Sequence, residues 1–437
     1  MSTVEIYSAD WIVPVDGPPV AQGAIVVGDD GRIVEIRADR GSSTAPRHEF
    51  PGAAIVPGFV NAHSHLEYAA FSGFGDGLPF APWLDLHIAR KRCLGEDGLL
   101  ASARLGAVQS LTSGITTVAD SAFSGAAASA CREVGLRGIV HIEVFGSDPA
   151  AVSERFESMR ERCRGSSLVQ PGIAPHAPYS ASAAVYRAAV ELGVPCATHL
   201  AESAAEQEFM LNGTGPIEKV AAMTRVQSPG VSSVRHLASE RAISTTTTAA
   251  HCVHVDDDEI ASLAQLDVGV AHCPRSNALL GCGVAPLTRL RDAGLRVGLG
   301  TDSPASALNF DMFAEMRTAV AFARAAARRP DALSASDVLR LATAGSADAI
   351  GLSDVVGTLT PGKQADLAII DIADTNFVPV EDISAAIVYG GSPRHVSRTI
   401  VGGRTRYRRG GSGWPGLQGA ARSARRSMLG RAARDAT

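Results

Sequence analysis

Short apolar runs alternate with Ala-, Leu- and Arg-rich stretches through the middle of the chain, from Ile55 to about Gly351. The runs show little polar alternation, which is typical of parallel strands buried on both faces. There are eight: IVPGFVNAH, ITTVADS, LRGIVHIEVFG, VQPGIAPHA, VPCATHL, TTTTAAHCV, VGVAHCP and VGLGTDS. Most precede a helix-compatible stretch, so the pattern predicts repeated β/α units. These units can form either a closed (β/α)8 barrel or an open, doubly wound sheet.

The residues that end these runs distinguish the two arrangements. Six of the eight runs carry histidine or aspartate at the C-terminal end, namely His63 and His65, Asp120, His176, His199, His251 and Asp302. A closed barrel brings all strand ends to one mouth, whereas an open sheet spreads them along a wide edge. The sequence therefore predicts an α/β protein with a (β/α)8 TIM-like barrel and an active site at the C-terminal mouth.

The two ends of the chain have a different pattern, with short β-branched runs separated by turns. The run GAIVV is separated from IVEIR by a turn that contains Asp-Asp-Gly, a hairpin signal, and similar runs follow Gly357. We therefore expect a small β-sandwich formed from residues 1–54 and 356–408, beside a catalytic barrel of residues 55–355.

The composition indicates a folded, reduced protein. Hydrophobic residues make up 46% of the 437 residues and charged residues 19%, which is typical of a globular chain with one large and one small domain. No run approaches the roughly 20 apolar residues of a membrane span, and no secretory signal is recognisable. The seven cysteines form no CxxC pair, which favours a cytoplasmic protein.

Charge is distributed unevenly along the chain. The net charge is −5, yet the segment from Arg404 onward holds nine arginines against one aspartate, so the rest of the chain is more acidic. An acidic body argues against nucleic acid as a partner. A basic segment could contact RNA or anionic lipid, but we expect residues 409–437 to be a solvated, flexible tail. The sequence is compatible with a homo-oligomer.

Four of the strand-end residues have the chemistry of a metal site. His63 and His65 lie two positions apart in an extended run, so both imidazoles point to one face. His199 ends the fifth run and Asp302 the eighth, each after small residues that let the backbone approach closely. Three neutral imidazoles and one carboxylate suit one divalent ion, zinc or alternatively iron. The alternative is a set of inert, hydrogen-bonded polar residues, which explains four such residues at one mouth poorly.

These motifs, in this order, resemble the amidohydrolase superfamily. The segments that carry the resemblance are PGFVNAHSHLE, HLAE, AHC, GTDSPAS and TLTPGKQADLAIID. The likeness is to the cytosine-deaminase-like and nucleoside-deaminase-like branch, which also includes triazine chlorohydrolases. It implies a barrel with a β-domain built from both chain ends, and hydrolytic removal of ammonia from an aminated heterocycle. Gly362 to Asp366 would belong to that β-domain and be structural.

The resemblance also assigns roles to individual residues. It makes His63, His65, His199 and Asp302 the ligands of one ion, because no inner run ends in the lysine that binuclear members carry. Asp302 would accept a proton from water, and His251 would stabilise the developing charge. Glu202 would protonate the ring nitrogen and then the departing amine. Zinc deaminases with a Pro-Cys-x-x-Cys set are excluded, since Cys273-Pro274 has no partner cysteine at that spacing.

Substrate-binding residues are expected around this centre. Glu67 comes just after the first metal motif, and Trp83 lies in the long loop that follows, which we expect to cover the pocket mouth. His176 matches a substrate-binding histidine of the resembled branch. Strand alternation does not tell us whether His141 or Glu143 faces the pocket, and we take Glu143 as the candidate.

The small-molecule substrate is expected to be the adenine moiety of a modified nucleoside. NAHSHLEY, FAPW and HIEVFG resemble the 6-aminodeoxyfutalosine deaminases of menaquinone biosynthesis. Methylthioadenosine/S-adenosylhomocysteine deaminases carry an acid shortly before the Trp, which Phe80-Ala81-Pro82-Trp83 lacks. The alternative substrates for a deaminase are methylthioadenosine, S-adenosylhomocysteine and guanine. The alternative functions are an s-triazine chlorohydrolase, a cyclic-amide hydrolase and a non-catalytic scaffold.

Overall fold

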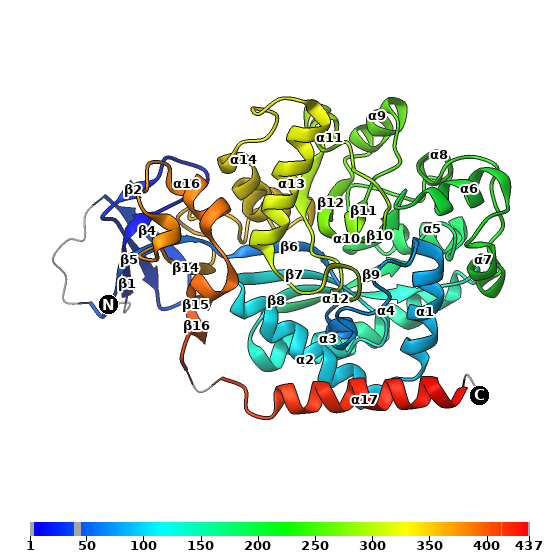
Figure 1. The fold of residues 1–437 in the computed structure, drawn as a ribbon, viewed down its shortest axis with the longest axis horizontal. Coiled ribbons are helices and arrows are strands. Elements are labelled where there is room, and N and C mark those ends of the chain that lie inside the picture. The colour runs from blue at the N-terminus through cyan, green and yellow to red at the C-terminus, as the bar shows by residue number, and fades with distance from the viewer. Residues whose placement is uncertain (1–3, 39–44, 412, 436–437) are drawn as a thin grey trace.

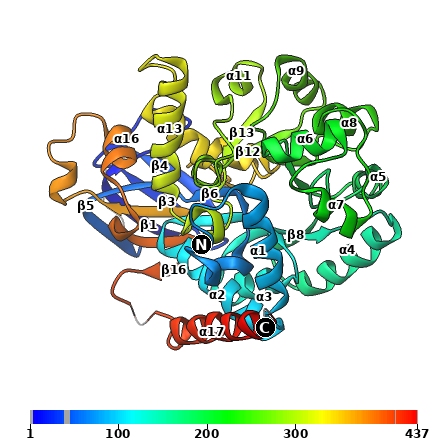
Figure 2. The same ribbon diagram turned by 45° about the vertical axis from the view of Figure 1, so that its right-hand side comes forward.

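A computed structural model describes residues 4–38, 45–411 and 413–435, and its strands form two separate sheets (Figures 1 and 2). The first is an eight-stranded parallel sheet with neighbours in chain order. Its strands are β6 (Phe59–Ser64), β7 (Ile115–Ala122), β8 (Arg137–Val144), β9 (Val169–Pro175), β10 (Cys196–Leu200), β11 (Thr247–His251), β12 (Gly269–His272) and β13 (Arg296–Leu299). All eight predicted runs are strands, and the predicted barrel is confirmed.

The barrel closes between its first and last strands. A parallel bridge joins Ser64 to Asp302, and the Asp302 N–H donates to the His63 carbonyl at 3.0 Å. Just before this bridge, the Asn61 side chain donates to Thr301 Oγ1 at 2.7 Å and accepts from the Thr301 N–H at 2.9 Å. Two residues predicted to bind metal therefore lie at the join itself.

Helices cover the outside of the barrel, mostly between consecutive strands. They are α1 (Phe80–Arg92), α2 (Glu96–Thr112), α3 (Ala126–Val134), α4 (Ala150–Cys163), α5 (Ala183–Glu191), α6 (Ala204–Asn212), α7 (Glu218–Thr224), α8 (Ser233–Ser239), α9 (Asp257–Gln265), α10 (Pro274–Leu279), α11 (Leu287–Asp292), α12 (Pro304–Ala307), α13 (Met312–Ala327), α14 (Ala335–Arg340) and α15 (Ser346–Ala349). Side-chain caps such as Ser182 on α5 and the Asp256–Glu259 capping box on α9 fix where helices begin.

The second sheet is mixed and is built from both ends of the chain, as predicted. Its strands are β1 (Val4–Ile12), β2 (Val20–Ala21), β3 (Ala24–Gly28), β4 (Ile33–Arg37), β5 (Arg47–Pro57), β14 (Leu367–Asp371), β15 (Val396–Val401) and β16 (Arg404–Arg408). Strand β5 pairs in parallel with β1 and antiparallel with β14, so N- and C-terminal segments share one sheet. The remaining short elements are α16 (Ile383–Ala385), η1 (Leu66–Phe71), η2 (Leu341–Gly345), η3 (Thr375–Phe377), η4 (Ala386–Gly390) and η5 (Pro393–His395).

A buried ion pair connects the two sheets. Arg137 at the start of β8 donates from Nε and Nη2 to both carboxylate oxygens of Asp366, at 2.9 and 3.0 Å. Asp366 also accepts from the Gly402 N–H at 2.7 Å. The Gly-Lys-x-Ala-Asp segment therefore ends on a residue that joins the barrel to the second sheet.

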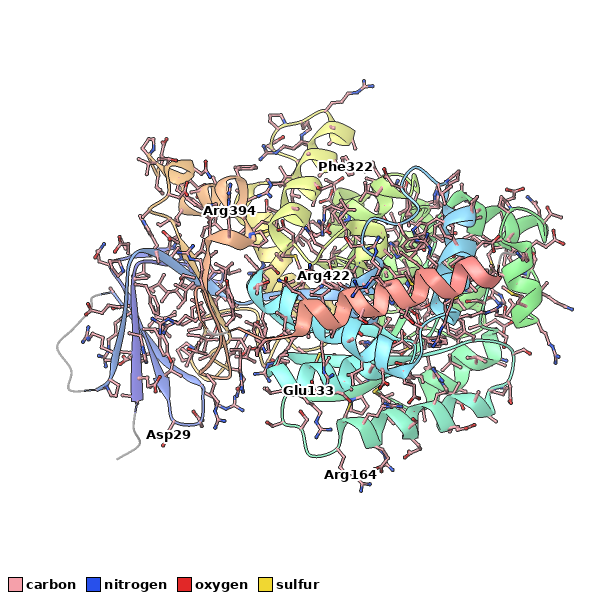
Figure 3. All side chains as sticks on the ribbon, turned by 60° about the horizontal axis from the view of Figure 1, so that its bottom comes forward. Asp29, Glu133, Arg164, Phe322, Arg394 and Arg422 are labelled. Carbon is pink, nitrogen blue, oxygen red and sulfur yellow. The ribbon has the colours of Figure 1, made fainter. Side chains whose placement is uncertain are left out.

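The expectation of a flexible C-terminal tail is wrong for most of residues 409–437. Residues Leu417–Asp435 form the long helix α17, which packs along α2 at the side of the barrel (Figure 3). Three spaced residues on it, Ala421, Ala424 and Met428, are buried. Arg425 donates from Nη1 to the carbonyls of Ala70 (3.2 Å) and Ser72 (2.7 Å). The apolar face is built largely from small alanines, so the sequence pattern conceals it.

Candidate active site

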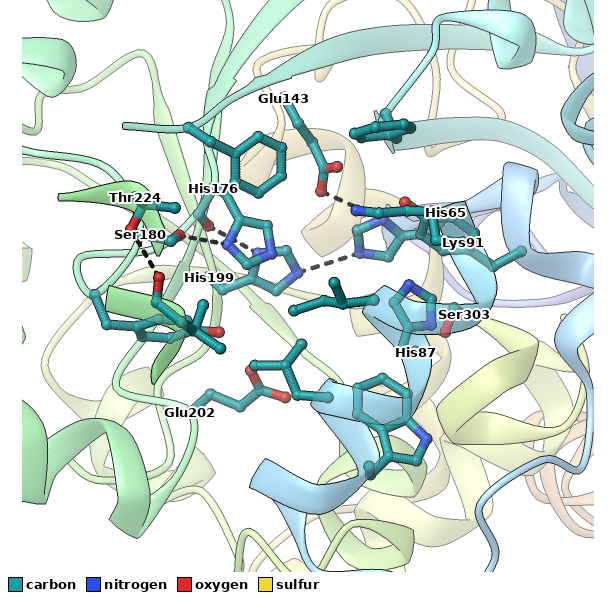
Figure 4. Close-up of a pocket in the computed structure, with 18 of the residues that line it drawn as sticks. His65, His87, Lys91, Glu143, His176, Ser180, His199, Glu202, Thr224 and Ser303 are labelled. Carbon is teal, nitrogen blue, oxygen red and sulfur yellow. Dashed lines mark hydrogen bonds and ion pairs between the residues drawn. The ribbon is translucent and has the colours of Figure 1, made fainter. Parts of the chain in front are cut away.

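The four predicted metal ligands come together at the C-terminal mouth of the barrel. His63 is the last residue but one of β6, His65 comes directly after that strand, His199 lies in β10 and Asp302 follows β13. One ligand atom from each lies within 4.8 Å of the others, and all four residues are buried. His65 Nε2 lies 3.2 Å from His199 Nε2, as the close-up in Figure 4 shows.

Hydrogen bonds on the far sides of two rings fix where their protons are. His65 Nδ1 lies 2.8 Å from the Ser121 carbonyl, and His199 Nδ1 lies 2.8 Å from the His176 carbonyl. Because a carbonyl only accepts, both Nδ1 atoms carry hydrogen and both Nε2 atoms present lone pairs. Two lone pairs that face each other across 3.2 Å repel unless a cation lies beside them.

The remaining donor atoms also fit a cation. His63 Nε2 is buried and has no hydrogen-bond partner in the part of the chain that the structure describes. Asp302 Oδ1 lies 3.6 Å from His63 Nε2 and 3.5 Å from His65 Nε2. Burial lowers the pKa of His65 to about 3 and also lowers those of His63 and His199. Neutral imidazoles and a carboxylate are the ligand set of zinc and of ferrous iron, so the residues fit one divalent ion.

Two hydroxyl groups orient the Asp302 carboxylate. Ser276 Oγ and Ser306 Oγ donate to its Oδ2 at 2.6 and 2.7 Å, which leaves Oδ1 turned toward the histidines. Asp302 also adopts a left-handed backbone conformation, with φ of 54°. Such backbone strain in a non-glycine residue is concentrated at functional sites. Ser306 belongs to the GTDSPAS motif, but nothing in the sequence indicated Ser276.

Glu202 and His251 form a second cluster with the same aspartate. One atom from each of Glu202, His251 and Asp302 lies within 4.8 Å of the others. His251 Nδ1 donates to Asn277 Oδ1 at 2.9 Å, so its unpartnered Nε2 faces Glu202 Oε1 at 3.6 Å. Burial, followed by the charges of Asp302 and Glu206, raises the pKa of Glu202 well above its usual value. Glu202 therefore tends to hold a proton.

Glu206 fixes the backbone on which Glu202 stands. Its carboxylate accepts from the N–H groups of Ala201 and Glu202, both at 2.9 Å, and Ser233 Oγ also donates to it. Ala201 has a φ of 51°, a strained value that these hydrogen bonds help to maintain. No motif or spacing in the sequence distinguishes Glu206 from the other acids near it.

A cavity of about 310 Å³ opens beside the two clusters. Helix α1 forms one wall with residues at helical spacing, namely Phe80, Trp83, Leu84, His87, Ile88 and Lys91. The segment that we expected to be a loop is thus partly helical, although Trp83 does line the cavity as predicted. The lining positions recur at helical spacing, but His87 and Lys91 among them weaken the apolar period that would have indicated a helix.

The other substrate-binding candidates have different outcomes. His176 and Glu143 line the cavity. Glu67 does not: its buried carboxylate accepts from Ser124 and from the Ala127 N–H at the start of α3. Its selection as a substrate-binding residue is therefore corrected to a helix-capping role.

The choice between His141 and Glu143 was wrongly posed. Positions two apart on a strand share a face, so both residues point the same way. Glu143 lies near the end of β8 and reaches the cavity, whereas His141 is buried one step deeper, against Gly172 of β9. Burial raises the pKa of Glu143 to about 7, and nearby Lys91 acts against that rise.

Comparison with known proteins places this geometry in a family. The model of the amidohydrolase family matches residues 54–406. The chain belongs to this family. A methylthioadenosine/S-adenosylhomocysteine deaminase from Symbiobacterium thermophilum is 34% identical over 422 residues, which cover 92% of this chain and 93% of that protein. One of the same name from Syntrophobacter fumaroxidans is 33% identical, covering 81% and 80%.

Solved structures of similar fold point the same way. An adenosine deaminase from Xanthomonas campestris with bound zinc has a TM-score of 0.86 at 26% identity, covering 98% of both chains. An atrazine chlorohydrolase from Arthrobacter aurescens, complexed with zinc, has a TM-score of 0.84 at 22% identity, covering 97% of this chain and 100% of that one. The latter likeness shows the fold alone. Family and deaminase relatives together identify this amidohydrolase as a hydrolase that acts on C–N bonds.

No helix in the described part of the chain is both long enough and apolar enough to cross a membrane.

Proposed function

We propose that this amidohydrolase removes the 6-amino group from the adenine ring of a nucleoside modified at its 5′ position. The observation that carries the proposal is the cluster of Glu202, His251 and Asp302 beside the three histidines. A divalent ion held by His63, His65, His199 and Asp302 would lower the pKa of water and so supply a nucleophile near neutral pH.

Each group of the second cluster has a proton to hold or move. Asp302 accepts the proton of the attacking water. Glu202, whose pKa is raised, donates to the ring nitrogen beside the amine-bearing carbon, which removes the aromatic resistance to attack. Ammonia, rather than amide ion, leaves once the amine has received a proton, and Glu202 can carry that proton from Asp302.

His251 stabilises the charge that develops at the carbon under attack. Its Nδ1 is held by Asn277, so Nε2 stays aimed at Glu202 and the reacting atoms. The φ of 76° at His251 puts its side chain in a position that a relaxed strand would not give.

The cavity favours a substrate larger than a free base. Its aromatic lining, including Phe80, Trp83 and Phe145, offers flat apolar surface for a ring and for an apolar 5′ substituent. Our first candidate is 6-aminodeoxyfutalosine, since the segment before Trp83 lacks an acid. Methylthioadenosine or S-adenosylhomocysteine is the second, and the names of the relatives favour it.

An ammonia-release assay tests the proposal. Zinc-loaded protein is given 6-aminodeoxyfutalosine, methylthioadenosine, S-adenosylhomocysteine, guanine and melamine, with chelator-treated protein as the control. We expect ammonia from at least one adenine nucleoside, at a kcat/KM at least about a hundredfold above that for guanine or melamine. Ammonia from guanine or melamine alone would refute it.

A further inference from the structure

Two charged side chains in the cavity remain without an assigned task. Five charged residues line it: Lys91, Arg92, Glu143, Glu202 and Asp302. The last two belong to the reacting centre, and Arg92 is exposed at the mouth. Lys91 and Glu143 are left, and Figure 4 shows both on the His65 side of the pocket, with Glu143 across the histidines from Glu202.

Glu143 presents an acceptor that the protein does not use. The residue is 2% exposed, and its Oε2 has no hydrogen-bond partner in the described part of the chain. The other oxygen, Oε1, lies 3.9 Å from His65 Nδ1, whose hydrogen already goes to the Ser121 carbonyl. A buried carboxylate oxygen without a partner costs stability unless a ligand supplies a donor.

Lys91 presents donors in the same region. Its Nζ lies 4.1 Å from the ring centre of Phe123, 5.3 Å from that of Phe145 and 6.0 Å from that of Tyr68. Within the residues that the structure describes, no oxygen forms a hydrogen bond or ion pair with it. Aromatic faces attract an ammonium group but do not replace its three hydrogen-bond acceptors.

The two groups are opposite in charge, yet no ion pair within 4.0 Å joins them in the described structure. A ligand group that both donates and accepts can bridge such a pair, and a hydroxyl group does both. A purely anionic group would pair with Lys91 but would be repelled by Glu143. Vicinal hydroxyls match best, because a carboxylate can accept from two at once while the ammonium donates to their oxygens.

We infer that Glu143 and Lys91 together bind the sugar hydroxyls of the substrate, with Glu143 accepting and Lys91 donating. This inference rests on the proposed function, since it supplies the sugar of the nucleoside whose base lies toward Glu202.

The test compares substrates that differ only in these hydroxyls. The zinc-loaded wild type, Lys91→Met and Glu143→Gln are assayed on adenosine, 2′-deoxyadenosine and 3′-deoxyadenosine. We expect the wild-type kcat/KM to be roughly 10- to 100-fold higher for adenosine than for either deoxy analogue. That factor corresponds to the loss of one hydrogen bond to a charged group. On adenosine, kcat/KM of each variant should fall by about that factor, mainly because KM rises. On the deoxy analogue that lacks the hydroxyl bound by the substituted residue, kcat/KM of that variant should fall little.

A matched control and a binding measurement make the result unambiguous. Lys219→Met removes a lysine of α7 whose Nζ lies 3.7 Å from Asp85 of α1, the helix that carries Lys91. Lys219 is exposed and outside the cavity, so this variant should behave as wild type. Binding without turnover is measured by calorimetry in the Glu202→Gln variant, with adenosine and with both deoxy analogues. The same affinities are measured in the double variant that also carries Lys91→Met.

The outcomes separate this inference from the proposed function. Equal losses on all three nucleosides, or equal wild-type rates on them, would overturn the inference while leaving adenine deamination intact. No ammonia from 6-aminodeoxyfutalosine, methylthioadenosine or S-adenosylhomocysteine, assayed alongside, would contradict the proposed function. In that case, a preference for adenosine in the binding measurement that vanishes in Lys91→Met would still support the sugar site, and its absence would refute the site.

Discussion

Glu202 combines a buried position, a raised pKa and a backbone held by Glu206. Glu202→Gln keeps the size of the side chain but cannot deliver a proton to the ring nitrogen. We expect kcat to fall by about 10²- to 10⁴-fold with zinc content and melting temperature unchanged. Glu208→Gln changes an exposed acid on α6, the helix that begins just after Glu202, and should have wild-type kcat. Near-normal turnover by Glu202→Gln would remove this residue from the mechanism.

Gly300 lies where the backbone passes close to the metal ligand His63. A Cβ atom there would lie 2.8 Å from His63 Cβ and 2.8 Å from Cys273 Sγ. We expect Gly300→Ala to displace His63, weakening zinc binding by about tenfold and lowering the free energy of unfolding by about 1–3 kcal/mol. Competition with a coloured chelator and a urea melt measure the two effects.

The control for that change is a glycine with open space around it. No atom lies within 4 Å of the Cβ position at Gly17, and its φ is ordinary. Gly17→Ala should therefore leave both zinc affinity and stability unchanged. An unchanged zinc affinity in Gly300→Ala would mean that the site tolerates a shift of His63.

The sequence predicted the roles of some functional residues and not of others. His63, His65, His199 and Asp302 could be predicted because each lies at or just beyond the C-terminal end of a strand, and a barrel brings those ends together. Glu67 was misassigned because an acid beside a metal motif looks functional, whereas its actual partners are backbone N–H groups sixty residues away in sequence. No local pattern encodes such a contact.

At the scale of elements, helix α17 supports the wall of the cavity. Its Arg425 binds the carbonyls that end η1, and Arg431 donates to the Cys93 carbonyl just beyond α1 at 3.4 Å. Both elements carry cavity-lining residues, Tyr68 on η1 and Trp83 on α1. The helix therefore stabilises the substrate wall from behind.

Arg425→Ala tests that support. Loss of its two hydrogen bonds should cost about 1–2 kcal/mol of stability and raise KM for the preferred nucleoside several-fold, with little effect on kcat. Arg426→Ala, an exposed neighbour on the same helix, is the matched control and should change neither. A fall in kcat with constant KM would instead link α17 to the reacting centre.

The elements most easily predicted were the buried strands, and the hardest were α1 and α17. The strands are apolar on both faces, so their sequences are distinctive. Helix α1 buries a face that mixes Phe, Trp, His and Lys, because that face lines a cavity instead of a uniform core. A mixed face has a weak apolar period, and the segment resembles a loop.

For the molecule as a whole, an ion at the site should contribute to folding stability. Three buried imidazoles and a carboxylate held close together are costly without a cation between them. We expect chelation to lower the melting temperature and zinc to restore it, with about 4 kcal/mol regained at a thousand times the dissociation constant. Thermal melts across a zinc titration measure this, and a melting temperature that is unaffected by zinc would contradict it.

A pair of histidine variants checks where that ion binds. His199→Asn should hold much less than one zinc per chain, whereas His236→Asn, on α8 outside both clusters, should hold one. Elemental analysis of dialysed protein gives the ratio. Full zinc content in His199→Asn would place the ion elsewhere.

The join of the barrel has a consequence for how the protein is made. Asn61 and Thr301, which are hydrogen-bonded across it, are 240 positions apart in the chain, and the ligands His63 and Asp302 come within two residues after them. A nascent chain can assemble the complete ligand set only after residue 302 has emerged from the ribosome, so metal uptake belongs to the last stage of folding. By the same reasoning, zinc once acquired would cross-link the earliest and latest strands, and its departure should accompany any opening of the cylinder.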